Sequence, residues 1–265
     1  MIDSLINAFE NKSGGLIHCI TNPISINQCA NVILAVSAKP IMAEHPCEVS
    51  EITATSDALL LNLGNITDVR IKSMKRSVKT ANKIGIPVVL DAVGTACSRI
   101  RRKLARRLIS KYSIDIVKGN YSEIYALYSD TYTGVGVDGD ENLNCTRIAE
   151  VSKQLAQKYR CVILASGKTD IITDGESVYF LRNGTPQMSQ VTGTGCMLGA
   201  VCTALCASGD TFLSAILACA VMTICAERVC SPSGSFTAKL IDEISLFKSE
   251  YLSKIKLEKW KNENI

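Results

Sequence analysis

Short apolar runs alternate with longer helical patterns along most of this chain, and this alternation constrains its fold more than any other feature. The runs are rich in Val, Ile and Leu and show no polar alternation, which is typical of parallel strands buried on both faces. Repeated strand, helix, strand units place helices on both sides of such a sheet. The sequence therefore predicts an α/β fold of three layers, with a mostly parallel central sheet covered by helices on both faces. The expected strands are residues 16–20, 58–63, 87–90, 114–117 and 161–165, and the expected helices are residues 24–36, 68–84, 100–110, 122–128 and 143–158.

The last third of the chain adds a hairpin and further helices. Residues 171–173 and 177–181 flank a turn with an Asp-Gly pair, which predicts a hairpin. The most apolar stretch, residues 212–226, is shorter than the ~20 residues that a membrane-spanning helix needs. It is expected to be a buried core helix, with no membrane partner. Because no linker or repeat is visible, residues 1–265 are expected to form a single domain.

The charge and cysteine content argue against nucleic-acid-binding and secreted classes. The net charge is only +4, and the basic cluster at residues 99–107 has no aromatic platform, so it is interpreted as the solvated face of a helix. The twelve cysteines lack zinc-binding spacing, and most lie in apolar stretches as small hydrophobes. The N-terminal segment is unlike a signal peptide. Free thiols without an export signal predict a cytoplasmic protein, and no nucleic-acid partner is expected.

Two glycine-containing segments resemble nucleotide-binding motifs but lack the context that those motifs need. Residues 134–139 match G-x-G-x-x-G letter for letter, yet no strand precedes them and no helix opens on them, so they are interpreted as a surface loop. Gly167-Lys168-Thr169 resembles the end of a P-loop, but Val162 occupies the position of its first glycine. Neither motif is therefore assigned.

The segment Gly193-Thr194-Gly195-Cys196 carries the strongest functional signal, because two glycines frame a threonine where a helix of small residues begins. Glycines let the backbone approach a ligand closely, and the free N–H groups of a helix N-terminus form an anion-binding site. Cys196 lies in the first helical turn, where a thiolate is favoured. The segment indicates phosphate or oxyanion binding, with a tight turn before a buried helix as the structural alternative.

Two carboxylates follow predicted strands and suit a metal ion. Asp91 ends an apolar strand, so it is expected to lie exposed at the carboxyl edge of the sheet, where open α/β folds bind ligands. Glu123 follows another strand in the segment 118–123. One or two carboxylates beside a polyphosphate are typical of a Mg²⁺ site. The structural alternative for Glu123 is a helix-capping acid.

Together these segments resemble the hydroxyethylthiazole kinase family, in the same order and from about residue 10 to residue 250. Cysteine at position 196 is part of that resemblance, because the wider ribokinase-like kinases place Asp there. The motifs that carry the resemblance are His18-Cys-Ile-Thr-Asn22, Ala30-Asn31, Lys39-Pro-Ile-Met-Ala43, Leu-Asn-Leu-Gly64, Asp91-Ala-Val-Gly94, Lys118-Gly-Asn-Tyr-Ser-Glu123, Ser166-Gly167 and Gly193-Thr-Gly-Cys196.

The resemblance implies a ribokinase-like fold and a kinase that uses ATP and Mg²⁺ to phosphorylate the hydroxyl of 4-methyl-5-(2-hydroxyethyl)thiazole, in thiamine biosynthesis and salvage. It also implies a homotrimer with active sites between subunits. By the same resemblance, Met42, Gly193 and Asn22 bind the thiazole, Lys118 and Ser166 bind ATP, Asp91 and Glu123 serve the metal, and Cys196 lies at the reacting hydroxyl, as a base or by positioning it.

Three residues depart from the usual pattern of that family. Lys118 stands in place of Arg, which keeps the charge but loses bidentate phosphate binding. Ser166 stands in place of Thr, and Ala92 stands in place of Pro after the aspartate. None of the three removes a needed charge, and Lys118 bears most directly on ATP affinity.

Three other functions stay open. A kinase of the same fold could act on another small alcohol, such as a hydroxymethylpyrimidine or a sugar. A thiol hydrolase or acyltransferase with Cys196 as nucleophile would need a base, and His18 and His45 are the two histidines of the chain. A catalytically weak nucleotide-binding relative is the third alternative.

Overall fold

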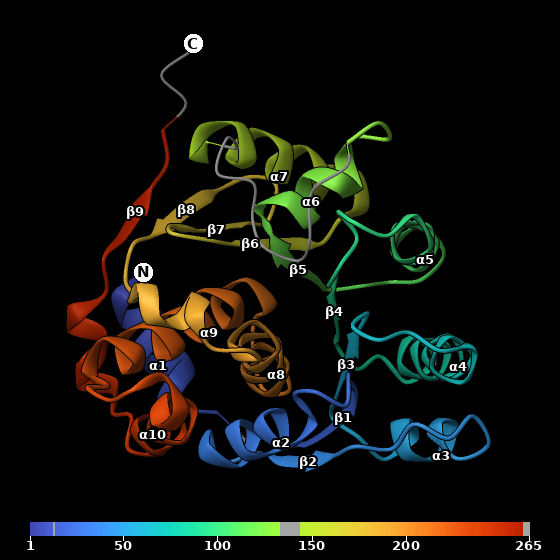
Figure 1. Cartoon of the computed structure of the whole chain (residues 1–265), viewed down its shortest axis with the longest axis horizontal. Helices are drawn as coiled ribbons and strands as arrows, with labels where there is room; N and C mark the ends of the chain where they lie inside the picture. The colour runs from blue at the N-terminus through green and yellow to red at the C-terminus, as the bar shows by residue number, and fades with distance from the viewer. Residues whose placement is uncertain (13, 133–143, 262–265) are drawn as a thin grey trace.

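The computed structural model describes residues 1–12, 14–132 and 144–261, and a nine-stranded sheet runs through this part of the chain (Figure 1). Its strand order is β2-β1-β3-β4-β5-β6-β7-β8-β9. The first six strands in this order are parallel, and β7, β8 and β9 pair antiparallel, which confirms a mostly parallel sheet. The strands are β1 (Leu16–Ile20), β2 (Lys39–Ile41), β3 (Ala58–Asn62), β4 (Val88–Asp91), β5 (Ile116–Asn120), β6 (Val162–Ser166), β7 (Asp170–Thr173), β8 (Val178–Leu181) and β9 (Leu257–Lys259).

Helices cover both faces of the sheet, which confirms the three predicted layers. α1, α2, α8, α9 and α10 pack on one face, and α3 to α7 pack on the other (Figure 1). The helices are α1 (Ile2–Glu10), α2 (Ile26–Ala35), α3 (Val49–Ala54), α4 (Asp68–Ile84), α5 (Arg99–Lys111), α6 (Tyr121–Tyr128), α7 (Cys145–Tyr159), α8 (Thr194–Cys206), α9 (Thr211–Arg228) and α10 (Ser233–Ser245), with 3-10 helices η1 (Pro186–Gln190) and η2 (Ser249–Lys254).

The predicted strands, helices and hairpin are all present, while α1, α3, β2 and β9 were missed. β2 and β9 are three-residue strands at the two edges of the sheet, and each contains lysine. Such edges lack the apolar run that marks a buried strand. The segment 134–139, interpreted as a surface loop, lies outside the described residues.

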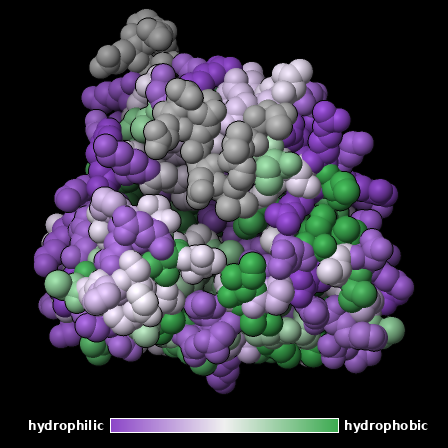
Figure 2. Space-filling model, viewed as in Figure 1, coloured by the Kyte–Doolittle hydropathy of each residue, from purple (hydrophilic) through white to green (hydrophobic). Residues whose placement is uncertain are grey.

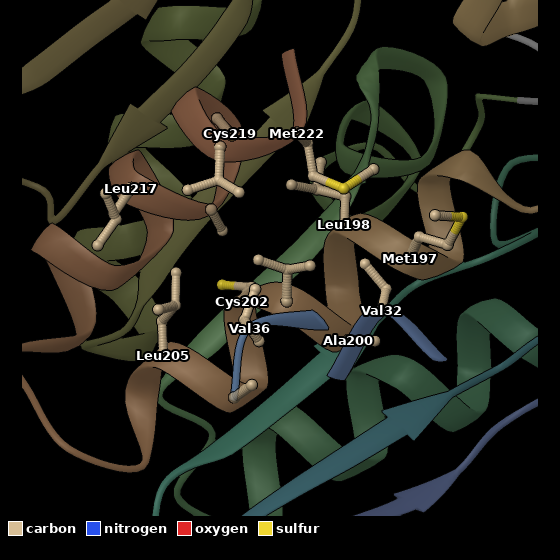
Figure 3. Packing of buried hydrophobic residues seen from close by; sticks show 14 of the residues in the cluster. Val32, Val36, Met197, Leu198, Ala200, Cys202, Leu205, Leu217, Cys219 and Met222 are labelled. Carbon is tan, nitrogen blue, oxygen red and sulfur yellow. The ribbon is translucent and has the colours of Figure 1, made fainter. Parts of the chain in front are cut away.

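Small side chains allow α2, α8 and α9 to pack closely on one face of the sheet. Figure 3 shows side chains of these helices directed at one another, among them Val32, Cys202 and Cys219. All twelve cysteines are free, and most are buried, as small hydrophobes are. By length and composition α9 could cross a membrane, but 72% of it is buried inside the protein. The prediction of a buried core helix there is confirmed.

The basic helix α5 is only partly the solvated face that the sequence predicts. Arg99, Lys103 and Arg107 are exposed, and hydrophilic residues gather over this region at the upper right of Figure 2. Arg102, by contrast, is buried. Its guanidinium donates to the carbonyls of Thr95 and Ala96, both over 3.0 Å, so it holds the loop between β4 and α5.

The turn between β6 and β7 is built on a buried carboxylate. Asp170 accepts a hydrogen bond from the Gly167 N–H over 3.1 Å, which fixes the turn after Ser166. A Cβ added at Gly167 would lie 2.9 Å from the ring of Tyr121, so glycine is needed for close packing rather than for a P-loop. Burial raises the pKa of Asp170 to about 6.

This raised pKa predicts a pH dependence of stability. The folded protein holds the Asp170 proton more tightly than the unfolded chain, so the free energy of unfolding should fall as pH rises from about 4 to about 6, by roughly 3 kcal/mol, and level off above that. Asp170→Asn should lack this slope. Urea denaturation of both proteins across that range measures the difference, and parallel curves would contradict the assignment.

Candidate active site

Three neighbouring parallel strands place polar side chains next to one another at the carboxyl edge of the sheet. The strand register pairs Asn62 with Asp91 and Asp91 with Lys118. Lys118 Nζ donates to Asp91 Oδ1 over 3.1 Å, and Asn62 Nδ2 donates to Asp91 Oδ2 over 3.0 Å. Each oxygen of the Asp91 carboxylate therefore has a partner. We call these three residues the polar row.

Asp91 is completely buried, so the prediction that it lies exposed was wrong. The physical reason is α8, which covers the end of β4. A Cβ added at Gly199 of α8 would lie 3.3 Å from Asp91 Oδ2, so this glycine lets the helix approach the carboxylate. Lys118 is also buried, with only 3% of its surface exposed, but unlike Asp91 it lines the adjoining pocket. Asp91 therefore acts on the pocket through Lys118.

Burial and mutual attraction set the charges of the row. Burial raises the pKa of Asp91, and Lys118 and Asn62 oppose this by stabilising the carboxylate. Burial also acts to lower the pKa of Lys118, but the attraction of Asp91 and Glu123 outweighs it, and the pKa of Lys118 lies above its ordinary value. The two groups form a buried ion pair, and loss of either one would leave the other charge without compensation.

The Cys196 sulfur is held beside this row by two side-chain amides. Asn22 Nδ2 and Asn62 Nδ2 donate to Cys196 Sγ over 3.2 and 3.3 Å. The orientation of the Asn62 amide is fixed, because its Oδ1 accepts from the Gly64 N–H over 2.8 Å and a backbone N–H can only donate. Its Nδ2 must then face Asp91 and Cys196. The sulfur accepts two hydrogen bonds and is held in place by them.

The start of α8 forms one wall of a pocket of about 530 Å³. Gly193 is the N-cap, with a φ of 101°, a left-handed conformation that glycine adopts without strain. The Thr194 hydroxyl donates to the Met188 carbonyl over 2.8 Å, which ties this turn to η1. A Cβ added at Gly195 would lie 3.2 Å from Lys118 Nζ. A positive side chain and the positive end of a helix therefore meet in this pocket.

Most of the predicted site residues line this one pocket. Met42 is not among the lining residues; it directly follows β2 at the edge of the sheet and packs against the core. The lining residues that the sequence predicts are Asn22, Lys118, Glu123, Ser166, Gly193 and Cys196.

Glu123 both caps a helix and lines the pocket. Its Oε2 accepts from the Asn120 N–H over 2.8 Å in a capping box, so the structural alternative holds. Its Oε1 accepts from the Gly94 N–H over 2.7 Å, which ties α6 to the loop after β4. Burial raises the pKa of Glu123 to about 7. The carboxylate is thus held rigidly at the pocket wall.

The two histidines lie in other surroundings. His18 Nδ1 and Nε2 contact the Thr53 hydroxyl and the Ala43 carbonyl, each over 2.9 Å. His45 Nδ1 accepts from the Cys47 N–H. In the part of the chain that the structure describes, neither ring contacts Cys196, so the geometry offers a thiol hydrolase no histidine base.

Sequence reasoning missed two residues that the geometry brings to the site. Asn62 carried a signal, as the one polar residue in an apolar run, yet no role was assigned to it. Arg101 lines the pocket but was hidden in the basic cluster of α5. A strand pattern shows that a residue is polar, but only the register shows what that residue contacts.

Glu123 fits a Mg²⁺ ion that is held mainly by phosphates and water. Among residues 1–12, 14–132 and 144–261, no cluster of three His, Cys, Asp or Glu side chains could hold a metal alone. Each Glu123 oxygen accepts one N–H and keeps a further lone pair for a cation or its water. Asp91 does not fit as a direct ligand, because its side chain is completely buried and does not line the pocket.

Comparison with known proteins gives the family. The chain matches the model of the Hydroxyethylthiazole kinase family over residues 6–250. It is 45% identical to hydroxyethylthiazole kinase 1 of Clostridium botulinum, over 86% of this chain and 89% of that protein. It is 41% identical to the hydroxyethylthiazole kinase of Clostridium beijerinckii, over 96% of this chain and 95% of that protein.

Solved structures agree on the fold. The hydroxyethylthiazole kinase protein of Pyrococcus horikoshii OT3 superimposes with a TM-score of 0.88 at 27% identity, covering 98% of this chain and all of that one. The pyridoxal kinase of Staphylococcus aureus, in complex with AMP-PCP and pyridoxal, has a TM-score of 0.62 at 15% identity, over 82% of this chain and 89% of that one, and supports the ribokinase-like fold alone. On its sequence and its structure, this chain belongs to the hydroxyethylthiazole kinase family.

Proposed function

We propose that this chain, as one domain over residues 1–265, transfers the γ-phosphoryl group of ATP to the hydroxyl of 4-methyl-5-(2-hydroxyethyl)thiazole. The proposal rests on one observation: a single pocket is lined by the α8 N-terminus, Lys118, Glu123 and Cys196. Phosphoryl transfer needs positioned donors and positive charge more than covalent chemistry, and this pocket offers both. The reaction belongs to thiamine salvage, in the cytoplasm.

The acceptor alcohol would lie against Cys196. Asn22 and Asn62 hold the sulfur where the helix begins, so a hydroxyl bonded to it also faces the N–H groups of residues 194–196. The sulfur positions the alcohol and accepts its proton as the new O–P bond forms. The lining of the same pocket includes the apolar residues Ile24 and Val191, which suit the thiazole ring.

The donor phosphates would lie against both the α8 N-terminus and Lys118, which adjoin each other in the pocket. The N–H groups at the start of α8 donate to no helical carbonyl, so they can bind phosphoryl oxygens. Lys118 Nζ shares one hydrogen bond with Asp91, so its other protons remain for ATP. Ser166 lies at the β6 edge of the same pocket. When Mg²⁺ is bound, held at Glu123 directly or through water, it neutralises charge on the β and γ phosphates.

Incubation with ATP, Mg²⁺ and a panel of small alcohols tests the function. We expect the phosphate ester of the thiazole alcohol, identified by its mass, to form at least tenfold faster than esters of a hydroxymethylpyrimidine or a sugar. Preference for one of those alcohols would establish the main rival, a kinase of the same fold with another substrate. No ester from any alcohol would reject kinase activity.

We also propose a homotrimer with Met42 near a subunit boundary. β2 is an edge strand, and Met42 at its end lies on the margin of the sheet instead of in the pocket. If its contact with thiazole comes from a neighbouring subunit, the active species must be an oligomer. Light scattering is expected to give three times the chain mass, whereas a fully active monomer would contradict the proposal.

Variants of Cys196 separate positioning from covalent catalysis. Cys196→Ala should lower kcat by about 10²- to 10⁴-fold and leave measurable turnover, because the helix N-terminus and Lys118 remain. Cys196→Asp should be faster than Ala, since Asn22 and Asn62 can donate to a carboxylate as they do to sulfur. Cys202→Ala, in the core of the same helix, is the control for packing. Equally inactive Ala and Asp variants that still bind ATP would favour a nucleophilic cysteine.

Substitution of the two carboxylates separates metal binding from stability. Glu123→Gln keeps a capping residue at the third helical position, so its melting temperature should change little while the Mg²⁺ concentration for half-maximal rate rises about tenfold. Asp91→Asn leaves Lys118 buried without its partner and should lower stability by about 3–5 kcal/mol. An unchanged Mg²⁺ dependence in Glu123→Gln would exclude that residue from the metal site.

A further inference from the structure

Arg101 presents an unpaired guanidinium to the pocket. It lines the pocket wall together with Lys118, Glu123 and the start of α8. In the described ranges, 1–12, 14–132 and 144–261, its side chain has no hydrogen-bond or ion-pair partner, while its backbone N–H donates to the Ser98 hydroxyl. An arginine with five free donors at the wall of a ligand pocket is available for a ligand.

The loop after β4 is shaped to receive this side chain. Gly94 has a φ of 77°, and a Cβ added there would lie 2.2 Å from Arg101 Nη1. Any other residue would displace the guanidinium. The Gly94 N–H donates to Glu123, so the loop that contacts Arg101 is also bonded to the carboxylate that lines the pocket.

Two neighbouring arginines of α5 make stabilising contacts of a kind that the Arg101 side chain does not make with any described residue. Arg102 is bonded to two carbonyls of the preceding loop, and Arg106 forms an ion pair with Asp130. Arg101 also lies in the first turn of α5, where a cation opposes the helix dipole. Its position is unfavourable for the helix, and its side chain bonds to no neighbour within the described part of the chain, which points to a role in binding.

We propose that Arg101 binds phosphoryl oxygens of the nucleotide and supplies the bidentate recognition that Lys118 cannot. The charge of Lys118 is largely offset by Asp91, its ion-pair partner in the polar row. Arg101 has no carboxylate partner among the residues that the structure describes, so its charge remains for the polyphosphate. A planar guanidinium matches a phosphate with two parallel hydrogen bonds, whereas an ammonium acts as a point charge. This inference rests on the proposed use of ATP.

Calorimetric titration with Mg²⁺ and a non-hydrolysable ATP analogue tests the proposal. Arg101→Ala should weaken binding by about 10- to 100-fold, and Arg101→Lys by less. Arg99→Ala, in the same helical turn but exposed, is the matched control and should bind like the parent. No variant should melt below the parent, because the Arg101 side chain bonds to no other described residue.

Each alternative result has a distinct meaning. Unchanged analogue affinity in Arg101→Ala would overturn the proposal and leave the kinase function intact. Loss of affinity for the thiazole alcohol, with analogue binding retained, would place Arg101 at the acceptor instead and also overturn it. A parent protein that fails to bind the analogue would overturn the proposed donor and this inference together.

Discussion

The buried ion pair between Asp91 and Lys118 is the interaction on which the rest of the site depends. Two charges removed from water are tolerated only when each has well-placed partners, and here the parallel register of β3, β4 and β5 supplies them. Asn62 donates a hydrogen bond to the second oxygen of the Asp91 carboxylate, and Gly199 allows α8 to pack closely over it. Close packing at Gly199 thus lets α8 cover the ion pair, and α8 in turn places its N-terminus at the pocket.

From this arrangement the chemistry of the pocket follows in order. The Asn62 side-chain amide donates both to the Asp91 carboxylate and to Cys196 Sγ, so this residue connects the buried ion pair to the sulfur. The Lys118 ammonium places its positive charge at the pocket wall beside Gly195. Glu123 also lines the pocket while it caps α6 and accepts from the Gly94 N–H. Asn62, Lys118 and Glu123 therefore shape the pocket through the same hydrogen bonds that hold the fold together.

Much of this could be predicted from the sequence. Uninterrupted apolar strands predict the parallel sheet, and Gly193 to Cys196 predict the helix start. The burial of Asp91 could not be predicted, because it depends on which helix covers the strand end and how closely. Nor could the role of Arg101 be distinguished from that of the exposed arginines of α5. Helical periodicity does not show which arginine packs against Gly94 in the loop after β4. Local pattern specifies elements, whereas contacts between distant elements specify the site.

A crystal structure of the complex with Mg²⁺, a non-hydrolysable ATP analogue and the thiazole alcohol would show directly whether α8 and Cys196 bind the reacting groups. We expect phosphoryl oxygens within hydrogen-bond distance of the N–H groups of residues 194–196 and of Lys118, with the alcohol oxygen against Cys196 Sγ and the Asp91–Lys118 pair intact. Terminal phosphates bound away from the start of α8, or an alcohol out of reach of Cys196, would contradict this expectation.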